Sequence, residues 1–470
     1  MPRFASRLRH ALPGLAITGS LLLGGLAAQA QPLFGPLDAT ASPQLRFSAA
    51  GQGQQPIHAG AEVAIAGQGF RPGQPVTLLY GTTALPGGAL VADAQGKVAA
   101  TLKLPADAVA GNHPILVITQ APYSASLATL KISPQIPLSG QAGYELSEAR
   151  VARGLYQSAY SARSHALFVT SAVGRPPVRQ SELLRLDADS LAITARVTPQ
   201  AAPARANAEG GVHAVYGIGV DDANGTVWVT NSRQDTVAVY RQSDLALVRQ
   251  FPPGTVSHAR DVVVDAVAGK AYASATFKPE VVVFDTRAPE VAGRIEIATR
   301  QRGATFSAAS LSLDAAAGRL YVVSNSTSEV AVIDTRAGRV EKVFPVPGAR
   351  GTIGVAHDPQ TGRIFVAAQG SDNLVVLDGA SGAVLADTPV GAGALNVVFD
   401  PQRRRAYVAS RGAGTVTVLD ADGRILANLG PAPLANHVAA GKDGTIFAVD
   451  KSANARGEEG DTLLRIRPRS

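Results

Sequence analysis

The chain has 470 residues, of which 46% are hydrophobic and 17% are charged, so it is neither a disordered chain nor a coiled coil, and its length favours two domains. The net charge of +7 falls to +4 without the three arginines of the first thirty residues, which is too mild an excess for a dedicated nucleic-acid binder. The absence of cysteine excludes disulfides, thiolate metal sites and a c-type haem attachment.

The first thirty residues are typical of a secretory signal peptide. Three arginines among the first nine residues precede a small and apolar stretch at 11–26, and residues 28–30 (Ala-Gln-Ala) match the small-x-small cleavage pattern. We therefore expect cleavage after Ala30 and a soluble bacterial protein, periplasmic or secreted. An uncleaved anchor is the alternative, but Pro13 and several glycines interrupt the short apolar run. No later segment is long and apolar enough to span a membrane.

Two segments follow the signal peptide. Residues 31–42 form a leader rich in proline, alanine and serine, which we interpret as a flexible tether. Residues 43–136 contain short segments of alternating polarity separated by turn residues, a pattern typical of a small β-sandwich. The stretches Gly67–Gly73 and Ala92–Gly96 resemble the Ig-like modules of bacterial exported proteins. We find no group of chemically active residues here, and expect a spacer or adhesion module.

The segment 140–468 repeats with a period of about 43 residues. In each full copy a strand ends in aspartate, a turn follows, and the next strand carries an aromatic residue seven positions after the aspartate, as Asp314 and Tyr321 show. A polar loop, a third strand and a tight turn such as Thr335–Gly338 then lead to an outer strand. The β-branched and aromatic content favours strands over helices. Four strands per period, repeated radially, hide the edges of an antiparallel sheet.

The unit Leu320–Gly338 contains Leu-Tyr-Val-Val-Ser-Asn followed by Val-Ala-Val-Ile-Asp-Thr-Arg-Ala-Gly. It resembles the repeats of the YVTN-type β-propellers, a family that includes the bacterial periplasmic YncE-like proteins, and the resemblance covers residues 145–468. It implies an all-β fold with a seven-bladed β-propeller behind the small Ig-like domain. The expected innermost strands begin near Leu155, Ala214, Ala259, Ala309, Ile353, Leu395 and Val438. The last copy lacks a fourth strand, so we expect residues 144–152 to supply it and close the ring.

Motifs that would identify an enzyme are missing from the sequence. There is no Walker loop, zinc-protease helix, Gly-x-Ser-x-Gly elbow or EF-hand loop. We therefore assign no catalytic residue, no metal and no cofactor. Four recurring aspartates could be taken for a carboxylate cluster: Asp285, Asp334, Asp378 and Asp420. Because a short turn follows each of them, we expect these carboxylates to accept hydrogen bonds from backbone amides of the turn.

The candidate ligand site lies at the mouth of the central channel. In propellers the links between blades and the loops from second to third strand share this face. The predicted rim consists of Arg153, His213, His258, Arg260, Arg302, Arg350, Asn396 and His437. The second-to-third-strand loops add Arg175, Arg233, Lys278, Arg411, Lys451 and Arg456. Such a rim would focus anions on the pore, and guanidinium groups bind phosphate or carboxylate in a two-pronged manner. The alternative is a solvated surface of arginines paired with loop acids and of isolated surface histidines.

Three functions remain open at this point. We favour a non-catalytic, monomeric binding or scaffold protein of the cell envelope, whose basic face binds an anionic ligand or a protein partner. The second is a single-stranded DNA-binding protein, for which Phe277 is the clearest stacking residue. The third is a propeller enzyme such as a lactonase or a quinone-dependent dehydrogenase. Such an enzyme would need metal-binding carboxylates or a cofactor-stacking tryptophan, and Trp228 lies within an expected strand.

Overall fold

The computed structural model describes residues 43–51, 55–204, 210–451 and 460–469. The predicted signal peptide and leader (1–42) lie outside the described residues. The regular secondary structure of the described chain is almost all β-strand, with short 3-10 helices at η1 (Gln141–Gly143), η2 (Ser232–Gln234) and η3 (Lys442–Gly444). None of its helices is long and apolar enough to cross a membrane.

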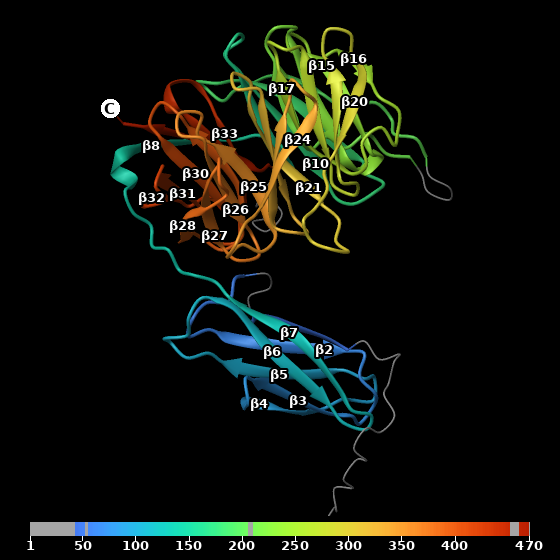
Figure 1. Cartoon of the computed structure of the whole chain (residues 1–470), viewed down its shortest axis with the longest axis vertical. Helices are drawn as coiled ribbons and strands as arrows, with labels where there is room; N and C mark the ends of the chain where they lie inside the picture. The colour runs from blue at the N-terminus through green and yellow to red at the C-terminus, as the bar shows by residue number, and fades with distance from the viewer. Residues whose placement is uncertain (1–42, 52–54, 205–209, 452–459, 470) are drawn as a thin grey trace, which may run out of the picture.

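The N-terminal part, residues 43–136, contains two antiparallel sheets that face each other (Figure 1). One sheet has the order β1 (Gln44–Ala49), β2 (Glu62–Gln68) and β5 (Val98–Lys103). The other has the order β4 (Thr83–Val91), β3 (Pro75–Tyr80), β6 (Gly111–Thr119) and β7 (Ser124–Ile132). Alternate residues point inward, so that Val63 and Ile65 of β2 are buried with Leu78 of β3 and Val117 of β6. This part therefore has a hydrophobic core of its own.

The described residues from Tyr144 to Pro468 form seven four-stranded antiparallel sheets, numbered here in chain order. Sheet 1 contains β9 (Leu155–Ser161), β10 (Ala166–Val173), β11 (Gln180–Asp187) and β12 (Ile193–Val197). Sheet 2 contains β13 (Ile218–Asp221), β14 (Thr226–Asn231), β15 (Thr236–Arg241) and β16 (Leu247–Gln250). Sheet 3 contains β17 (Ala259–Asp265), β18 (Lys270–Ala275), β19 (Glu280–Asp285) and β20 (Glu290–Glu296). Sheet 4 contains β21 (Ala308–Asp314), β22 (Arg319–Ser324), β23 (Glu329–Asp334) and β24 (Arg339–Pro345).

Sheets 5 to 7 continue the same pattern. Sheet 5 contains β25 (Thr352–His357), β26 (Arg363–Ala368), β27 (Asn373–Asp378) and β28 (Val384–Pro389). Sheet 6 contains β29 (Ala394–Asp400), β30 (Arg405–Ser410), β31 (Thr415–Asp420) and β32 (Ile425–Leu429). Sheet 7 contains β33 (Ala435–Ala440), β34 (Ile446–Asp450), β35 (Thr462–Pro468) and β8 (Tyr144–Arg150). The first strand of each sheet contacts the first strand of the next sheet, and β33 of sheet 7 contacts β9 of sheet 1. The sheets therefore form a closed ring.

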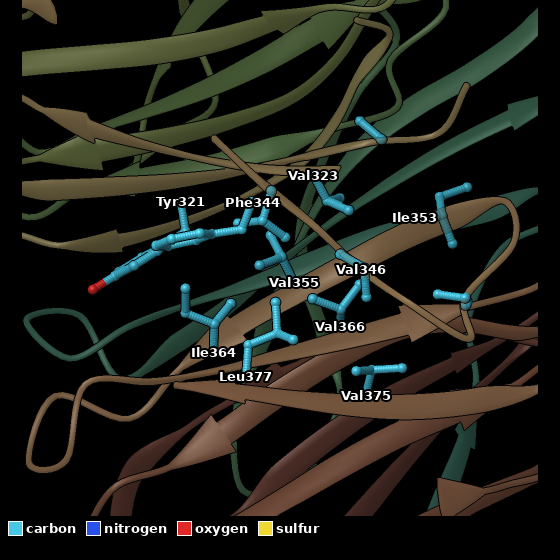
Figure 2. Packing of buried hydrophobic residues seen from close by; sticks show 14 of the residues in the cluster. Tyr321, Val323, Phe344, Val346, Ile353, Val355, Ile364, Val366, Val375 and Leu377 are labelled. Atoms are coloured by element: carbon cyan, nitrogen blue, oxygen red, sulfur yellow. The ribbon is translucent and has the colours of Figure 1, made fainter. Parts of the chain in front are cut away.

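The second and third strands of each sheet are apolar on both faces, because each sheet packs between two neighbours. Figure 2 shows this packing between sheets 4 and 5, where Tyr321 and Val323 of β22 lie against Ile364 and Val366 of β26. Ile364 and Val366 are fully buried. Burial of a side chain of this size stabilises the fold by roughly 1.5–3 kcal/mol. The unbroken apolar runs of the sequence follow from this two-sided burial.

The four recurring aspartates bind their turns, as expected from the sequence. Asp334 Oδ1 accepts hydrogen bonds from the amides of Arg336 (2.8 Å) and Ala337 (2.9 Å). Asp285 Oδ1 likewise accepts hydrogen bonds from the amides of Arg287 (2.8 Å) and Ala288 (3.1 Å). These amide hydrogen bonds lower the pKa of both carboxyls below the usual value. The aspartates are turn-forming residues spread around the ring, one in each of four sheets.

The segment between the N-terminal part and the ring is hydrogen-bonded to sheet 6. Ser139 and Asn428 exchange two backbone hydrogen bonds of 3.0 Å, and Asn428 Nδ2 donates to Ile136 O at 2.9 Å. On the sandwich itself, Lys131 Nζ lies 2.6 Å from Asp372 Oδ1, a carboxylate that is only 1% exposed. The N-terminal part is thus attached to the ring at sheets 5 and 6 (Figure 1).

The two ends of the ring segment meet in sheet 7. β8 pairs antiparallel with β35, from Tyr144 opposite Pro468 to Arg150 opposite Thr462. Asp461 and Ala152 extend this pairing, since the Asp461 amide donates to Ala152 O at 3.0 Å. The fourth strand of the last sheet therefore comes from the start of the ring segment.

Deletion of residues 31–137 should leave a ring that unfolds in one cooperative transition, because β8 and Ser139 remain. Deletion of residues 31–152 removes β8, and with it backbone hydrogen bonds that are each worth about 0.5–1.5 kcal/mol. We expect its thermal midpoint to lie at least about 10 °C lower, at roughly 2–4 °C per kcal/mol. Scanning calorimetry of both variants tests this, and equal midpoints would show that β8 does not hold the ring closed.

Candidate functional site

A cavity of about 460 Å³ lies at the end of the ring where the inner strands begin. It is lined by residues of sheets 1, 2, 3, 6 and 7. Five cationic side chains line it: Arg153, Arg233, Arg260, Arg411 and Lys451. Arg153 precedes the inner strand β9 and Arg260 lies on the inner strand β17, whereas the other three belong to connections from a second to a third strand. Loops that are far apart in the chain therefore bring these charges together.

Two tyrosines hold the cationic groups at the cavity wall. The rings of Tyr156 and Tyr216 meet edge to face, with centroids 4.8 Å apart. Arg260 Nη1 donates to Tyr156 Oη and Arg233 Nε donates to Tyr216 Oη, each at 3.4 Å. Lys451 Nζ lies 4.8 Å from the centre of the Tyr156 ring, within the range of a cation–π contact. The wall therefore combines positive charge with aromatic surface.

Asp461 supplies the single carboxylate among the described residues that line this cavity. Its Oδ2 accepts hydrogen bonds from the amides of Gly154 (2.7 Å) and Leu155 (3.0 Å) and so fixes the start of β9. Burial lowers the pKa of Lys451 to about 8, and repulsion by the positive charges of Arg411 and Arg233 contributes to this shift. The negative charge of Asp461 acts in the opposite direction and raises the pKa. The site therefore favours the approach of negative charge.

The three predicted histidines have different surroundings. His258 lines the cavity and stacks on Phe277 with ring centroids 4.2 Å apart, and 69% of the Phe277 side chain is exposed. His213 is buried beside Gln200 O, 3.2 Å from its Nδ1. His437 Nδ1 accepts a hydrogen bond of 3.4 Å from the Ser158 amide. Burial lowers the pKa of all three, and for His437, where Arg260 adds repulsion, the pKa falls to about 3.

The remaining predicted rim residues lie outside the cavity lining. Arg302 and Arg350 are exposed to solvent. Asn396 is buried, and its Oδ1 accepts a hydrogen bond from the Val438 amide at 3.0 Å, which links sheet 6 to sheet 7. Of the eight rim residues, the structure thus brings together Arg153, His258 and Arg260 in the cavity, while His437 adjoins it through Arg260.

The additional basic loop residues also divide into two groups. Arg233, Arg411 and Lys451 line the cavity, whereas Arg175 and Lys278 do not. Arg456 lies outside the described residues. The sequence analysis missed Tyr156, Tyr216 and Asp461. Tyr156 directly follows Leu155, the predicted start of an inner strand. An aromatic residue at this position of an inner strand could therefore have been predicted to line the channel mouth.

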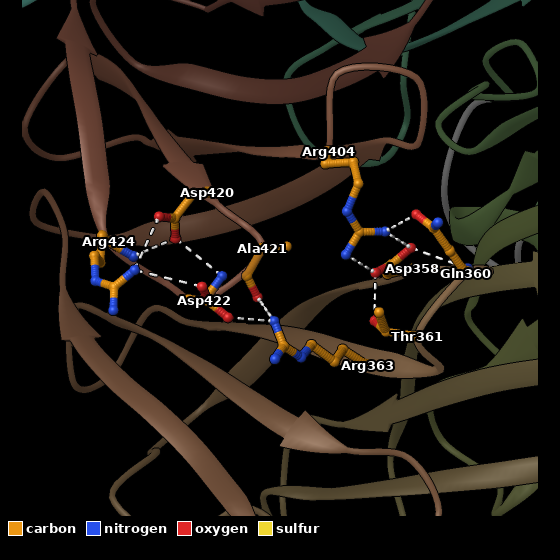
Figure 3. Close-up of polar contacts among 9 residues, drawn as sticks. All are labelled: Asp358, Gln360, Thr361, Arg363, Arg404, Asp420, Ala421, Asp422 and Arg424. Atoms are coloured by element: carbon orange, nitrogen blue, oxygen red, sulfur yellow. Dashed lines mark hydrogen bonds and ion pairs between the residues drawn. The ribbon is translucent and has the colours of Figure 1, made fainter.

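Arginines at the opposite end of the strands form ion pairs between sheets, as Figure 3 shows for sheets 5 and 6. Arg363 Nη1 donates to Asp422 Oδ1 (2.6 Å) and to Ala421 O (2.7 Å). Arg404 Nη2 lies 2.7 Å from Asp358 Oδ2, which is fully buried. These two arginines are each paired with an aspartate of the neighbouring sheet, in contrast to the cavity arginines Arg260 and Arg411 within the described part of the chain.

Among the described residues, no group of three or more histidine, aspartate or glutamate side chains is placed to hold a metal ion. The cavity lining offers guanidinium, ammonium and phenol groups, which bind anions and donate hydrogen bonds.

Comparison with known proteins establishes the fold. No family model matches the sequence, and no curated protein matches it. Among solved structures, Kuenenia stuttgartiensis hydrazine synthase matches 68% of this chain and 97% of its own, with a TM-score of 0.54 and 16% identity. A catalytically inactive variant of Staphylococcus aureus virginiamycin B lyase, with quinupristin, matches 69% of this chain and 99% of its own, with a TM-score of 0.53 and 12% identity.

Both structures are β-propeller proteins. The chain has a β-propeller fold. At this level of identity the likeness shows the fold alone, and one fold hosts many functions. The function of this propeller must therefore be argued from its cavity.

The depressed pKa of His437 predicts a dependence of stability on pH. Below about pH 6.5 the unfolded chain binds a proton at this residue, while the folded chain keeps it neutral until about pH 3. Stability is therefore lost as the pH falls through this window, by up to about 1.4 kcal/mol per pH unit. His437→Gln should reduce this loss, measured as the free energy of unfolding in urea between pH 7 and pH 4. If the free energy of unfolding depends on pH in the same way in the variant and in the natural protein, His437 does not cause the loss of stability.

Proposed function

We propose that this protein is a non-catalytic binding protein of the cell envelope, and that its propeller cavity binds a small anion bearing phosphate or carboxylate groups. One observation carries the proposal: five cationic side chains and two tyrosines line one cavity of about 460 Å³ that contains a single described carboxylate. Guanidinium groups match the paired oxygens of carboxylate and phosphate, and tyrosine adds a hydroxyl donor and an apolar face.

Mutual repulsion of the cavity cations favours an anion. Arg411 and Arg233 both lower the pKa of Lys451, which measures their unfavourable effect on its positive charge. A bound anion would relieve this repulsion and raise that pKa again. Arg260 Nη1 donates to Tyr156 Oη at 3.4 Å, which holds this guanidinium group at the cavity wall.

The type of propeller and of N-terminal domain is also part of this proposal. We assign the seven sheets as the seven blades of a YVTN-type, YncE-like propeller at 140–468, with residues 144–152 as the closing strand. The sandwich at 43–136 is assigned as an Ig-like domain. The predicted signal peptide supports export to the periplasm or beyond the cell, where the protein acts as a monomer on its ligand or on an envelope partner.

Single-stranded nucleic acid is the second candidate ligand. It is supported by Phe277, which is exposed and stacks on His258 at the edge of the cavity. A base could stack on this pair while its phosphate approaches the arginines. For a cofactor-dependent enzyme the comparable observation is lacking, because Trp228 is fully buried and packs against Phe251 and Phe284.

Binding of inorganic phosphate and of a dicarboxylate, measured by calorimetry at low salt, tests the proposed site. Arg260→Ala and Arg411→Ala should each weaken binding about 10- to 100-fold, because each removes a charge-assisted hydrogen bond. Affinity should also fall as salt rises.

Arg302→Ala and Arg350→Ala are the matched controls, since these arginines are exposed and lie outside the cavity lining. They should leave affinity unchanged. Equal losses in both pairs would mean diffuse attraction and no site. A strong preference for single-stranded DNA, lost in Phe277→Ala, would favour the second candidate.

A further inference from the structure

We propose that Lys451 is a nucleophilic amine that captures the carbonyl carbon of an anionic ligand, a 2-oxo acid or an aldehyde phosphate, as a reversible imine. The inference rests on the proposed anion-binding function of the same cavity and names the class of ligand. It stands on three features of the described structure: the contact of the Lys451 ammonium with an aromatic face, the arginines around it, and the space beside it.

Lys451 lines the cavity, where an aromatic ring holds its ammonium group. Its Nζ lies over the Tyr156 ring at 4.8 Å from the ring centre, and within the described residues no carboxylate lies at ion-pair distance from it. Two other lysines are bound to oxygen: Lys131 Nζ lies 2.6 Å from Asp372 Oδ1, and Lys342 Nζ donates to Ala380 O at 2.7 Å. A π-face attracts the ammonium without fixing its hydrogens as an oxygen acceptor does.

The surroundings of Lys451 increase the fraction of neutral amine, the form that attacks a carbonyl. Burial, Arg411 and Arg233 lower its pKa to about 8, and Asp461 is the described acid that opposes them. Roughly a tenth of the amine is then neutral at pH 7 and about half at pH 8, against less than a thousandth for an ordinary lysine at pH 7. Desolvated lysines beside cations are activated nucleophiles for this reason.

The arginines of the cavity would bind the anionic group of the ligand, while Lys451 reacts with its carbonyl group. Arg260 and Arg411 line the same cavity as Lys451 and would hold the carboxylate or phosphate of the ligand. A 2-oxo acid carries its carbonyl on the carbon next to the carboxylate, so an anion held by a guanidinium group lies within one bond of the reacting carbon. Holding the two reactants in this way replaces an encounter in solution by a local reaction.

The step needs no oxidant or reductant. The amine lone pair forms a bond to the carbonyl carbon, the π electrons move to the oxygen, and a proton moves from nitrogen to that oxygen to give a carbinolamine. Loss of the hydroxyl group as water, with a proton, leaves the imine between Lys451 and the ligand. The reverse reaction releases the ligand unchanged, so the step is covalent binding and not turnover.

Reductive trapping tests the inference on the full chain. The protein is incubated with pyruvate or pyridoxal 5′-phosphate, reduced with borohydride, digested and analysed by mass spectrometry. We expect the adduct on the peptide that contains Lys451. At ligand concentrations well below saturation, where the rate reflects the ligand-free cavity, labelling should become faster as the pH rises, with a midpoint near 8. Excess inorganic phosphate and Arg411→Ala should each slow the labelling at least about 10-fold, since both remove the hold on the anion.

Lys451→Arg should abolish the adduct, and its melting curve would show that the fold is kept. Lys278→Arg is the matched control, because Lys278 is an exposed lysine in another second-to-third-strand connection, outside the cavity lining. It should leave labelling unchanged. Labelling of Lys278 as fast as that of Lys451 would overturn the inference. Phosphate binding without a Lys451 adduct would overturn it while the proposed function stands, and absence of both would overturn both.

Discussion

Two-sided burial is the constraint on which the ring depends. The middle strands of each sheet are apolar on both faces, so no sheet can satisfy its hydrophobic surface without a neighbour on either side. Side chains on the inner strands add polar links between successive sheets: Gln157 Oε1 accepts from the Ile218 amide and Asp261 Oδ2 accepts from the Leu311 amide. These links satisfy buried backbone amides that the sheets themselves leave unpaired. The ring is consequently stable only as a whole.

Most of this architecture could be predicted from the sequence because the sequence repeats. The spacing from Asp314 to Tyr321 recurs because each sheet solves the same packing problem, so the strands and their turns could be predicted. The cavity was only partly predictable. A period gives the position of a residue along a strand, and it does not give the distance of a loop from the axis of the ring. Arg260 and Arg350 looked equivalent for this reason, yet one lines the cavity and the other is exposed.

Residues missed by the sequence analysis depend on contacts between distant segments. Tyr156 contacts Arg260 of sheet 3 and Lys451 of sheet 7, and no local sequence pattern encodes these contacts. The attachment of residues 136–139 likewise depends on Asn428, almost three hundred residues away. Both features arise from ring closure, which brings the first sheet beside the last. The cavity chemistry and the placement of the sandwich are therefore tertiary properties.

The pairing of β8 with β35 also determines when the ring can finish folding during synthesis. Sheet 7 needs Tyr144–Arg150 and Thr462–Pro468 together, so it cannot form until both of these distant segments have been synthesised. Until then β8 has no partner strand and sheet 1 lacks its neighbour in sheet 7. Such contacts of high sequence separation are slow to form, because a long loop must close first. The ring is therefore completed last at sheet 7, where the two most distant segments of its sequence pair.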